Sequence, residues 1–491
     1  MGFLYRLVIL FFFFISCTKH SQIPEEIILA KIGPSIITIQ DFIRRSEYTI
    51  RPDYCKQDNY IHKKIILNSL ISEKLTALEF DKGISQVNDE YLEHFLNGRK
   101  EQVMRQLYFS EEFYSKVKLS EKEIKDALRF SGRKITVKFL NLPDLDLVEK
   151  IKELDSANIA LDSIHSVLWG GNAPTKEFDW FNREVDEIHD ALFNENIFKG
   201  KLLGPFESEE DTFILMKIVS WKDQIKITEY DKNLLRKDVK EKLTDKKAKK
   251  AYLESIKDLM SGKKMNLNSD VFYRYAEKAT DYFFKVHESK KKMLNQVLWD
   301  DNQIEDNMFT FDVKDNDIEP SSIILDYGGE SWTVGELNQH LKSHPFVFRK
   351  RKMNRSEFPK QLRLAIADLI RDIEITKECY KRGLDKNWSV SLNYNMWQDV
   401  SKSKKYVSGL RLKNKQIDSQ DEWLAFMNPL IDSLQNIYSD KIKINMEMFE
   451  KVELTKTDMM VTQRGVPYPI LVPSFPILTT DDRLDFGSKI K

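Results

Sequence analysis

Cysteine is scarce in this chain, which excludes a fold held together by disulfides. Among 491 residues there are three cysteines, and after Cys17 only Cys55 and Cys379 remain. Two cysteines do not make a disulfide framework, so we expect both to lie in helices as thiols. Glycine and proline are also sparse, at 17 and 14 residues, which leaves little room for disordered segments.

The chain also lacks net charge. Its 77 basic and 77 acidic residues cancel, which argues against nucleic acid as the main partner because phosphate binding favours a positive excess. No P-loop, G-x-G-x-x-G, H-E-x-x-H or paired C-x-x-C motif occurs, so the sequence predicts no nucleotide, metal or other cofactor. With 31% charged and 41% hydrophobic residues, the chain is typical of a globular, helix-rich protein of several domains.

The longest apolar run lies in the N-terminal segment MGFLYRLVILFFFFISC, residues 1–17. Arg6 precedes an apolar stretch at 7–15 that is too short to cross a bilayer but has the length of a signal-peptide core. Cys17 directly follows the small residue Ser16, and this junction resembles a bacterial lipoprotein signal. The resemblance implies that the leader is removed and that Cys17 is lipidated. An ordinary secretory signal followed by a chance cysteine is the alternative.

Stable attachment by lipid needs two or more acyl chains. The resemblance to a lipoprotein signal implies a membrane-anchored lipoprotein of the cell envelope that faces the periplasm, with the outer membrane favoured over the inner one. Elsewhere no apolar run is long enough to cross a membrane.

An internal duplication is visible in two segments that lie far apart. Residues 27–42 read IILAKIGPSIITIQDF and residues 323–337 read IILDYGGESWTVGEL. Each has an apolar triplet, a glycine and an apolar–Thr–apolar trio, a pattern that predicts a hairpin whose threonine begins a helix. An acidic residue follows three positions later, as in a capping box; the pairs are Thr38 with Asp41 and Thr333 with Glu336.

A long helix is expected after each copy, at 63–83 and at 360–383, because apolar residues recur there at helical spacing. We expect both helices to be amphipathic. Each ends in a basic residue followed by glycine, at Gly83 and Gly383, which is typical of a helix C-terminus. A chance similarity of two capped helices is the alternative to a true repeat.

Between the copies the pattern becomes that of a small α/β domain. Its expected elements are a strand at 134–142, a helix at 146–155, a turn at Gly170-Gly171, a helix at 184–194 and a buried strand at 211–221. Lysine-rich helices are expected next, at about 229–262 and 272–297. The tail at 465–476 contains four prolines, so it should run extended over a surface.

In this order of elements the sequence resembles the exported parvulin-type foldases, the SurA and PrsA group of peptidyl-prolyl isomerase chaperones. The likeness covers about residues 25–300. ITIQDF at 37–42, LISEKLTALEFDKGIS at 70–85 and KLSEKEIKDAL at 118–128 look like the N-terminal chaperone region. Residues 177–218 follow the parvulin order of aromatic turn, helix, glycine, Gly-Pro and final strand.

The resemblance implies an α+β fold in which mainly helical chaperone modules flank a small parvulin-like α/β domain. The expected regions are a lipoprotein signal at 1–17, an N-terminal chaperone region at 18–130, a parvulin-like domain at 131–224, a helical connector at 225–310, a second chaperone-like repeat at 311–400 and a C-terminal region at 401–491.

Catalysis by parvulins, as the resemblance implies, uses two histidines and a cysteine or aspartate beside an apolar proline pocket. Here Thr136, Val137 and Lys138 stand where the first histidine belongs, and Ile214 or a neighbour stands at the second. Both family histidines are missing, so we name no catalytic residue. His165 and His189 fall on other elements, where we expect surface histidines.

The candidate substrate-binding residues are the aromatic and methionine side chains that match or surround the family's cleft: Trp180, Phe193, Phe206, Phe213 and Met216. A groove lined by such side chains adapts to varied chains. Ordinary core packing is the alternative for each of them. We expect the proline-rich tail to dock within the chain, either as a strap over the C-terminal helices or in this cleft.

Three hypotheses for function follow. The first is an exported, lipid-anchored folding factor that binds unfolded or nascent exported proteins, with doubtful isomerase activity. The second is an active peptidyl-prolyl cis-trans isomerase whose site has shifted to other residues. The third is a structural subunit of an envelope assembly.

Overall fold

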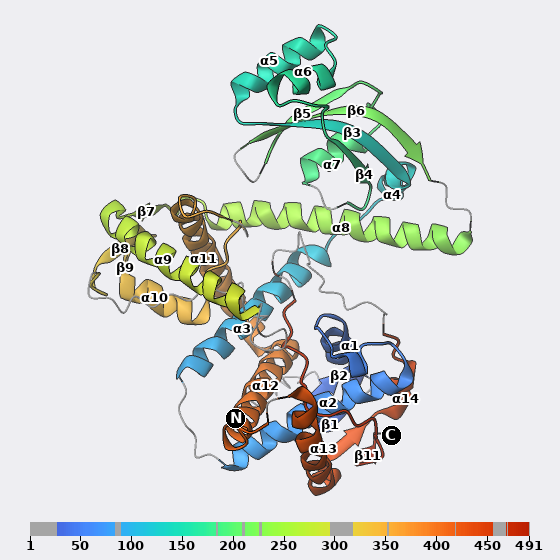
Figure 1. Ribbon diagram of the computed structural model, residues 1–491, viewed down its shortest axis with the longest axis vertical. Helices are drawn as coiled ribbons and strands as arrows, with labels where there is room; N and C mark the ends of the chain where they lie inside the picture. The colour runs from blue at the N-terminus through green and yellow to red at the C-terminus, as the bar shows by residue number, and fades with distance from the viewer. Residues whose placement is uncertain are drawn as a thin grey trace, which may run out of the picture. The chain divides into compact units, whose positions relative to one another are not determined.

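The computed structural model describes residues 27–83, 90–182, 185–208, 212–224, 228–294, 318–350, 353–417, 419–454, 468 and 470–490. These form two compact units, which Figure 1 shows coloured along the chain. The first unit combines the residues up to Asp89 with Lys386–Val461 and Val472–Lys491, and the second combines Glu90–Asp385 with Thr462–Leu471. The predicted signal at 1–17 and its lipid-bearing Cys17 lie outside the described residues. Strands and helices occur in both units, so the predicted α+β class is confirmed.

The first unit is built on a four-stranded sheet in the order β11–β10–β1–β2. β1 (Ile28–Ile32) and β2 (Ser35–Thr38) form the predicted hairpin, and Gly33 at their turn has a φ of 57°, which favours glycine. β10 (Ile442–Ile444) pairs antiparallel with β1, and β11 (Ser488–Lys489) pairs parallel with β10. The C-terminal segment thus completes the sheet that the N-terminal hairpin begins.

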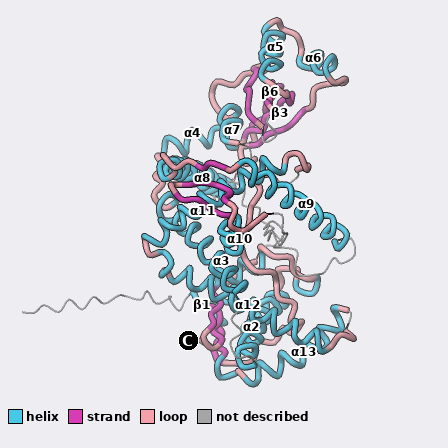
Figure 2. The backbone as a smooth tube through the Cα atoms, turned by 90° about the vertical axis from the view of Figure 1, so that its left-hand side faces the viewer, coloured by secondary structure: helices cyan, strands magenta, loops and turns pink. Residues whose placement is uncertain are grey.

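Helices pack around this sheet, and the Thr38 hydroxyl caps the first of them by accepting the Asp41 N–H at 3.0 Å, as the capping box predicts. Figure 2 shows α12 and α13 beside α2. The helices of the first unit are α1 (Ile39–Glu47), a 3₁₀ turn (Asp53–Cys55), α2 (Tyr60–Gly83), α12 (Trp388–Lys413), α13 (Gln420–Ile437), a second 3₁₀ turn (Ser439–Lys441) and α14 (Met446–Lys451).

The expectation that the helix at 63–83 is amphipathic is wrong. α2 is buried around most of its circumference because β1, α12 and α13 all pack against it. Several of its buried polar groups are paired with others: Asn68 Oδ1 accepts a hydrogen bond from Gln435 Nε2 at 2.6 Å, and the Thr76 hydroxyl lies 2.8 Å from the Ser403 hydroxyl. In the sequence such internally paired residues look the same as solvent-facing ones.

The central domain of the second unit is an antiparallel sheet in the order β4–β3–β6–β5. α5 (Leu145–Ser156) and α6 (Leu161–Leu168) cover one face, and α7 (Asp186–Leu192) covers the other (Figure 1). The strands are β3 (Arg133–Leu142), β4 (Thr175–Asp179), β5 (Leu202–Glu207) and β6 (Phe213–Asp223).

The central strand pair and its helices agree with the sequence pattern. The strands predicted at 134–142 and 211–221 are confirmed as β3 and β6, and the helices at 146–155 and 184–194 as α5 and α7. The pattern does not predict the edge strands, because an edge strand such as β4 leaves its first three residues exposed and lacks a buried alternation.

Four further helices belong to the second unit. The predicted lysine-rich helices are confirmed as α8 (Glu229–Leu259) and α9 (Ser269–Leu294). α3 (Glu90–Phe109) continues into a π-helical turn, and α4 (Glu121–Ser131) begins with a capping box of Ser120 and Glu123.

The second unit also contains a hairpin and a capped helix that match those of the N-terminal copy, so the elements predicted for the second copy are present. β8 (Ile323–Tyr327) and β9 (Glu330–Thr333) form the hairpin, and the capping box of Thr333 begins α10 (Val334–Ser343). The register irregularity between Ile28 and Ala30 in the first hairpin recurs between Ile323 and Leu325 in the second. α11 (Phe358–Lys381) then corresponds to α2, and each is 24 residues long.

The repeat includes a third strand that the sequence analysis missed. β7 (Met265–Leu267) pairs antiparallel with β8 as β10 pairs with β1. Asn268 and Asn445 follow these strands, and each donates its N–H at 2.9 Å to its hairpin, to Ile324 O and Leu29 O respectively. The segments read MNLNSDVF at 265–272 and IKINMEMF at 442–449. β7 precedes its hairpin in the chain, whereas β10 follows its hairpin. A comparison of the two copies in chain order therefore does not align these strands.

The division into units differs from the predicted regions. The expected region 18–130 is split between Asp89 and Glu90. Most of the expected region 401–491 shares a unit with the N-terminal hairpin, while Thr462–Leu471 belongs to the second unit. The physical reason is that β1 finds its third strand, β10, near the other end of the chain.

The proline-rich tail contains neither helix nor strand where it is described, until β11. Phe475 belongs to the hydrophobic core that contains α13, which agrees with the expected strap over the C-terminal helices. Tyr468 belongs to the second unit, where its hydroxyl bonds to that of Tyr252 at 2.9 Å and to Asp372 Oδ1 at 3.1 Å. These partners lie on α8 and α11, so Tyr468 does not occupy the predicted cleft.

In the described part of the chain, no helix is long and apolar enough to cross a membrane. Cys55 and Cys379 are both buried thiols, as expected. Burial raises the pKa of the Cys379 thiol to about 12.

Candidate functional site

Three rings meet beside the sheet of the central domain, and we call Trp180, His189 and Phe193 the aromatic cluster. Trp180 directly follows β4, His189 lies on α7, and Phe193 ends that helix. The ring centroids lie 4.5 Å apart for Trp180 and His189, 5.5 Å for Trp180 and Phe193, and 5.0 Å for His189 and Phe193. These separations are typical of favourable aromatic contacts.

Four of the five predicted substrate-binding residues share the hydrophobic core of this sheet face: Trp180, Phe193, Phe206 and Met216. Phe213 packs instead on the opposite face with α5 and α6, because residues three apart on one strand point to opposite sides. Trp180, Phe193 and Met216 are only 5%, 7% and 3% exposed, as the core-packing alternative expects, while Phe206 is half-buried. Binding of substrate by these residues stays a prediction.

α8 lies over the aromatic cluster. Val239 is fully buried in the same core, and Leu235 and Leu243 pack beside it. Lys242 on this helix donates a hydrogen bond to Trp180 O. Burial lowers the pKa of Lys242 to about 8. This amine therefore begins to lose its proton at a pH only slightly above neutral.

The expectation that His189 is a surface residue is wrong. Its side chain is 7% exposed, with Nε2 lying 3.2 Å from Trp180 O and Nδ1 lying 3.7 Å from Asp190 Oδ1. His165 does lie at the surface, beside Trp169, and its Nδ1 is 3.1 Å from Gly171 O. α7 therefore places one histidine inside the cluster, although not at a position where the parvulin resemblance expects one.

The strand positions matched to the family histidines are apolar on the cluster's face of the sheet. Val137 is fully buried in the shared core, and Ile214 packs partly buried against it. Lys138 is engaged elsewhere, in an ion pair with Asp162 of α6. Neither strand thus brings an imidazole to the cluster.

One polar atom of the cluster has no assigned partner. Trp180 Nε1 is buried and finds no hydrogen-bond acceptor among the described residues. An indole N–H is a donor only, so the partner that it lacks is an acceptor such as a carbonyl oxygen. The same described residues contain no group of three His, Cys, Asp or Glu side chains that could hold a metal ion.

Sequence signals for the missed features exist. His189 and Phe193 are four residues apart on one helix, a spacing that puts both rings on the same side. Leu235, Val239 and Leu243 repeat every fourth position in a lysine-rich helix, which indicates an apolar stripe that needs cover.

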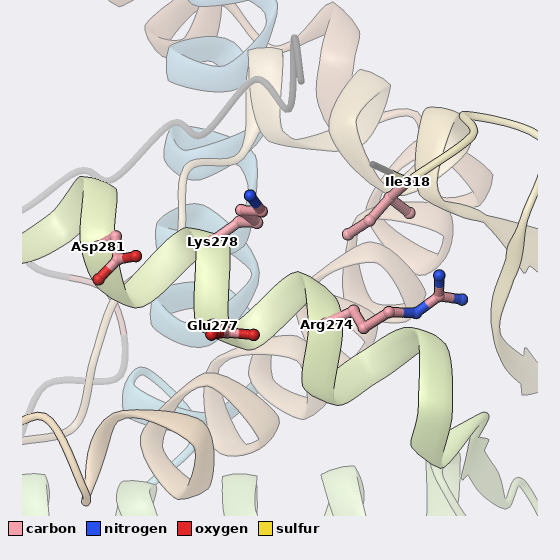
Figure 3. A pocket seen from close by; sticks show the side chains of 5 residues that line it. All are labelled: Arg274, Glu277, Lys278, Asp281 and Ile318. Atoms are coloured by element: carbon pink, nitrogen blue, oxygen red, sulfur yellow. The ribbon is translucent and has the colours of Figure 1, made fainter. Parts of the chain in front are cut away.

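A cavity of about 300 Å³ lies elsewhere in the second unit, along α9. Figure 3 shows Arg274, Glu277, Lys278 and Asp281 on this helix and Ile318 on a facing segment. Asp281 pairs with Arg355. The lining mixes both charges, and none of the predicted substrate-binding residues contributes to it.

No protein-family model and no curated protein matches the chain. Among solved structures it is similar to the peptidylprolyl isomerase PrsA from Bacillus cereus, at 16% identity over 45% of this chain and 88% of that one, with a TM-score of 0.20. It is also similar to the foldase protein PrsA from Streptococcus pneumoniae, at 13% identity over 46% and 93%, with a TM-score of 0.19. At these TM-scores the likeness assigns neither a family nor an activity, so the proposals below rest on the chain's own residues.

Proposed function

We propose that this chain is an exported folding factor that binds unfolded or nascent exported proteins and does not depend on prolyl isomerisation. The observation that carries the proposal is the apolar lining at Val137 and Ile214, where the parvulin resemblance expects histidines. The central domain also has apolar side chains that a client could reach, since Val167, Phe198 and Trp169 are 85%, 60% and 48% exposed.

Binding without catalysis is consistent with the physics of the prolyl bond. The barrier to its rotation is about 18–20 kcal/mol, and lowering it requires groups that stabilise the twisted amide more than the planar one. Val137 is a buried and Ile214 a half-buried hydrocarbon side chain, and a hydrocarbon offers neither a hydrogen bond nor a charge that would favour the twisted amide. These two positions therefore supply no catalytic group.

The test measures client binding and isomerase activity on the same protein. We expect the full chain to retain fluorescently labelled, reduced and carboxymethylated α-lactalbumin, a permanently unfolded protein, in size-exclusion chromatography. In a protease-coupled assay at micromolar protein we expect no acceleration of a Xaa-Pro peptide. Failure to retain the unfolded protein overturns the proposal.

An active isomerase is the second candidate, and the buried His189 beside Trp180 and Phe193 favours it. In this case the protease-coupled assay detects acceleration. His189→Gln and Phe193→Ala should then each lower that acceleration at least tenfold, because the first variant removes the imidazole of the cluster and the second removes its phenyl ring. His165→Gln is the matched control because His165 lies at the surface of the same domain.

The lipid anchor is part of the proposal, and the Ser16–Cys17 junction supports it. Cells that express the full chain should incorporate labelled palmitate into it, and Cys17→Ser should abolish the incorporation. Labelling that persists in Cys17→Ser overturns the anchor. A pull-down that returns one stoichiometric envelope protein, in place of many exported clients, favours the third hypothesis, a structural subunit.

A further inference from the structure

In the first unit, both edges of β10 are occupied. β1 lies on one side, and on the other side Ile490 N–H donates to Ile444 O at 3.0 Å. Gly487 approaches β10 so closely that a Cβ there would lie 2.6 Å from Ile442 O, and its φ of 78° also favours glycine. An extended segment therefore pairs with the outward backbone groups of Ile442 and Ile444.

β7 occupies the equivalent place in the repeat, with the same register against its hairpin. Met265, Asn266 and Leu267 lie opposite Tyr327, Asp326 and Leu325, as Ile442, Lys443 and Ile444 lie opposite Ile32, Lys31 and Ala30. Asn268 N–H bonds to the hairpin, so the antiparallel alternation turns Asn266 inward as well. The backbone groups of Met265 and Leu267 consequently face outward.

In contrast to β10, β7 has no second partner strand in the described part of the chain. Its sheet consists there of β7, β8 and β9 in that order. The C-terminal segment that could fill such an edge, β11, is already paired with β10. The repeat thus offers the same edge twice, once filled and once open among the described residues.

We propose that the outer edge of β7 binds an extended segment of an unfolded client protein, which runs parallel to β7 as β11 runs parallel to β10. This inference rests on the proposed function and names the site at which a client pairs its backbone. Strand addition recognises main-chain groups, so it suits clients of varied sequence. Met265 and Leu267 pack against the core of the repeat, which keeps the edge in an extended conformation.

Amide hydrogen exchange on the full chain locates the contact. We expect the Met265 and Leu267 amides to exchange rapidly in the free protein and to slow at least tenfold when unfolded, carboxymethylated α-lactalbumin binds. The Asn266 amide, turned toward β8, should already be slow in the free protein. Protection of Met265 and Leu267 that appears without client and depends on protein concentration would mean that a second copy fills the edge, which overturns the inference.

Matched variants separate the backbone donor from the side chain. Met265→Pro removes an outward N–H at the first residue of an edge strand, where proline is tolerated, and Met265→Ala removes the side chain but keeps the donor. We expect Met265→Pro to bind the unfolded protein about fivefold more weakly than Met265→Ala, because one intermolecular hydrogen bond is lost.

Each outcome is decisive. Equal binding by folded Met265→Pro and Met265→Ala overturns the inference. If Met265→Pro does not fold, the exchange of the wild-type amides decides alone. Retention of the unfolded protein without slowing at Met265 and Leu267 overturns the inference and leaves the proposed function intact. If the full chain does not retain the unfolded protein at all, both this inference and the proposed function are overturned.

Discussion

At the scale of single residues, a buried ionic network connects several elements of the first unit. Arg45 binds Glu73 with both guanidinium nitrogens, at 3.1 and 2.8 Å, and both side chains are 2% exposed. Lys74 Nζ lies 3.2 Å from Asp399, and Arg45 also donates to Ser474 O at 2.8 Å. The network thereby joins α1, α2 and α12 to the tail.

Glu73→Gln tests this network through its pH dependence. Burial on its own raises the pKa of Glu73, but Arg45 and Lys74 outweigh it and hold that pKa below its ordinary value. A lowered carboxyl pKa contributes stability above the unfolded-state value of about 4.3 and loses it as the pH falls further. At pH 7 we expect Glu73→Gln to lower the free energy of unfolding by about 3–5 kcal/mol, since Arg45 stays buried without its counter-charge.

Urea unfolding at pH 7 and at pH 4 or below measures both parts of this prediction, and the difference between wild type and variant should shrink at the lower pH. Glu447→Gln is the control, because Glu447 pairs with Lys451 at the surface and should have little effect. A Glu73→Gln protein as stable as wild type at pH 7 contradicts the prediction.

At the scale of elements, close helix contact in the second unit depends on one glycine. A Cβ at Gly98 on α3 would lie 1.9 Å from Ser343 O at the end of α10, a distance that no real side chain tolerates. Gly98→Ala should therefore lower the free energy of unfolding by about 1–3 kcal/mol, as overpacking does elsewhere. The measurement is thermal or urea unfolding.

Gly409→Ala is a control of opposite sign. Nothing lies within 4 Å of a Cβ at Gly409 in α12, so alanine should stabilise that helix by up to about 1 kcal/mol. If Gly98→Ala stabilises the protein as Gly409→Ala does, the close contact between α3 and α10 is not the reason that position 98 requires glycine.

At the scale of the whole molecule, the tail contributes to both units. Phe475 is 2% exposed in the core of the first unit, while Tyr468 is 5% exposed in the second. The Tyr468 ring also lies 5.2 Å from the Arg105 guanidinium. Burial and the nearby Asp372 raise the pKa of Tyr468 well above its ordinary value, so its hydroxyl stays protonated as a donor.

Variants at these two positions should weaken different units. Phe475→Ala should lower hydrogen-exchange protection in the first unit by about 3–5 kcal/mol, because it leaves a cavity. Tyr468→Phe should lower protection in the second unit by about 1 kcal/mol, the worth of a typical hydrogen bond. Mass spectrometry of exchanged peptides reports the units separately. Unchanged protection of the first unit in Phe475→Ala contradicts a structural role for the tail.

The sequence by itself determined the features that depend on neighbours in the chain. The two hairpins, the capping boxes at Thr38 and Thr333, the strand pair β3 and β6 and the lysine-rich helices all follow from local spacing and composition. These elements are stabilised by hydrogen bonds and apolar contacts between residues a few positions apart. The sequence shows such residues directly. The aromatic residues of the candidate site were named in a different way, from the resemblance to the parvulin order of elements.

Only the tertiary structure decided which distant segments meet. It paired β1 with β10, buried α2 around most of its circumference, brought His189 against Trp180 and Phe193, and laid α8 over that cluster. These contacts join residues whose separation along the chain has no local signature, and a polar residue satisfied inside a core has the same letter as one in water. The repeat of β7 and β10 became visible only when both were seen paired to their hairpins.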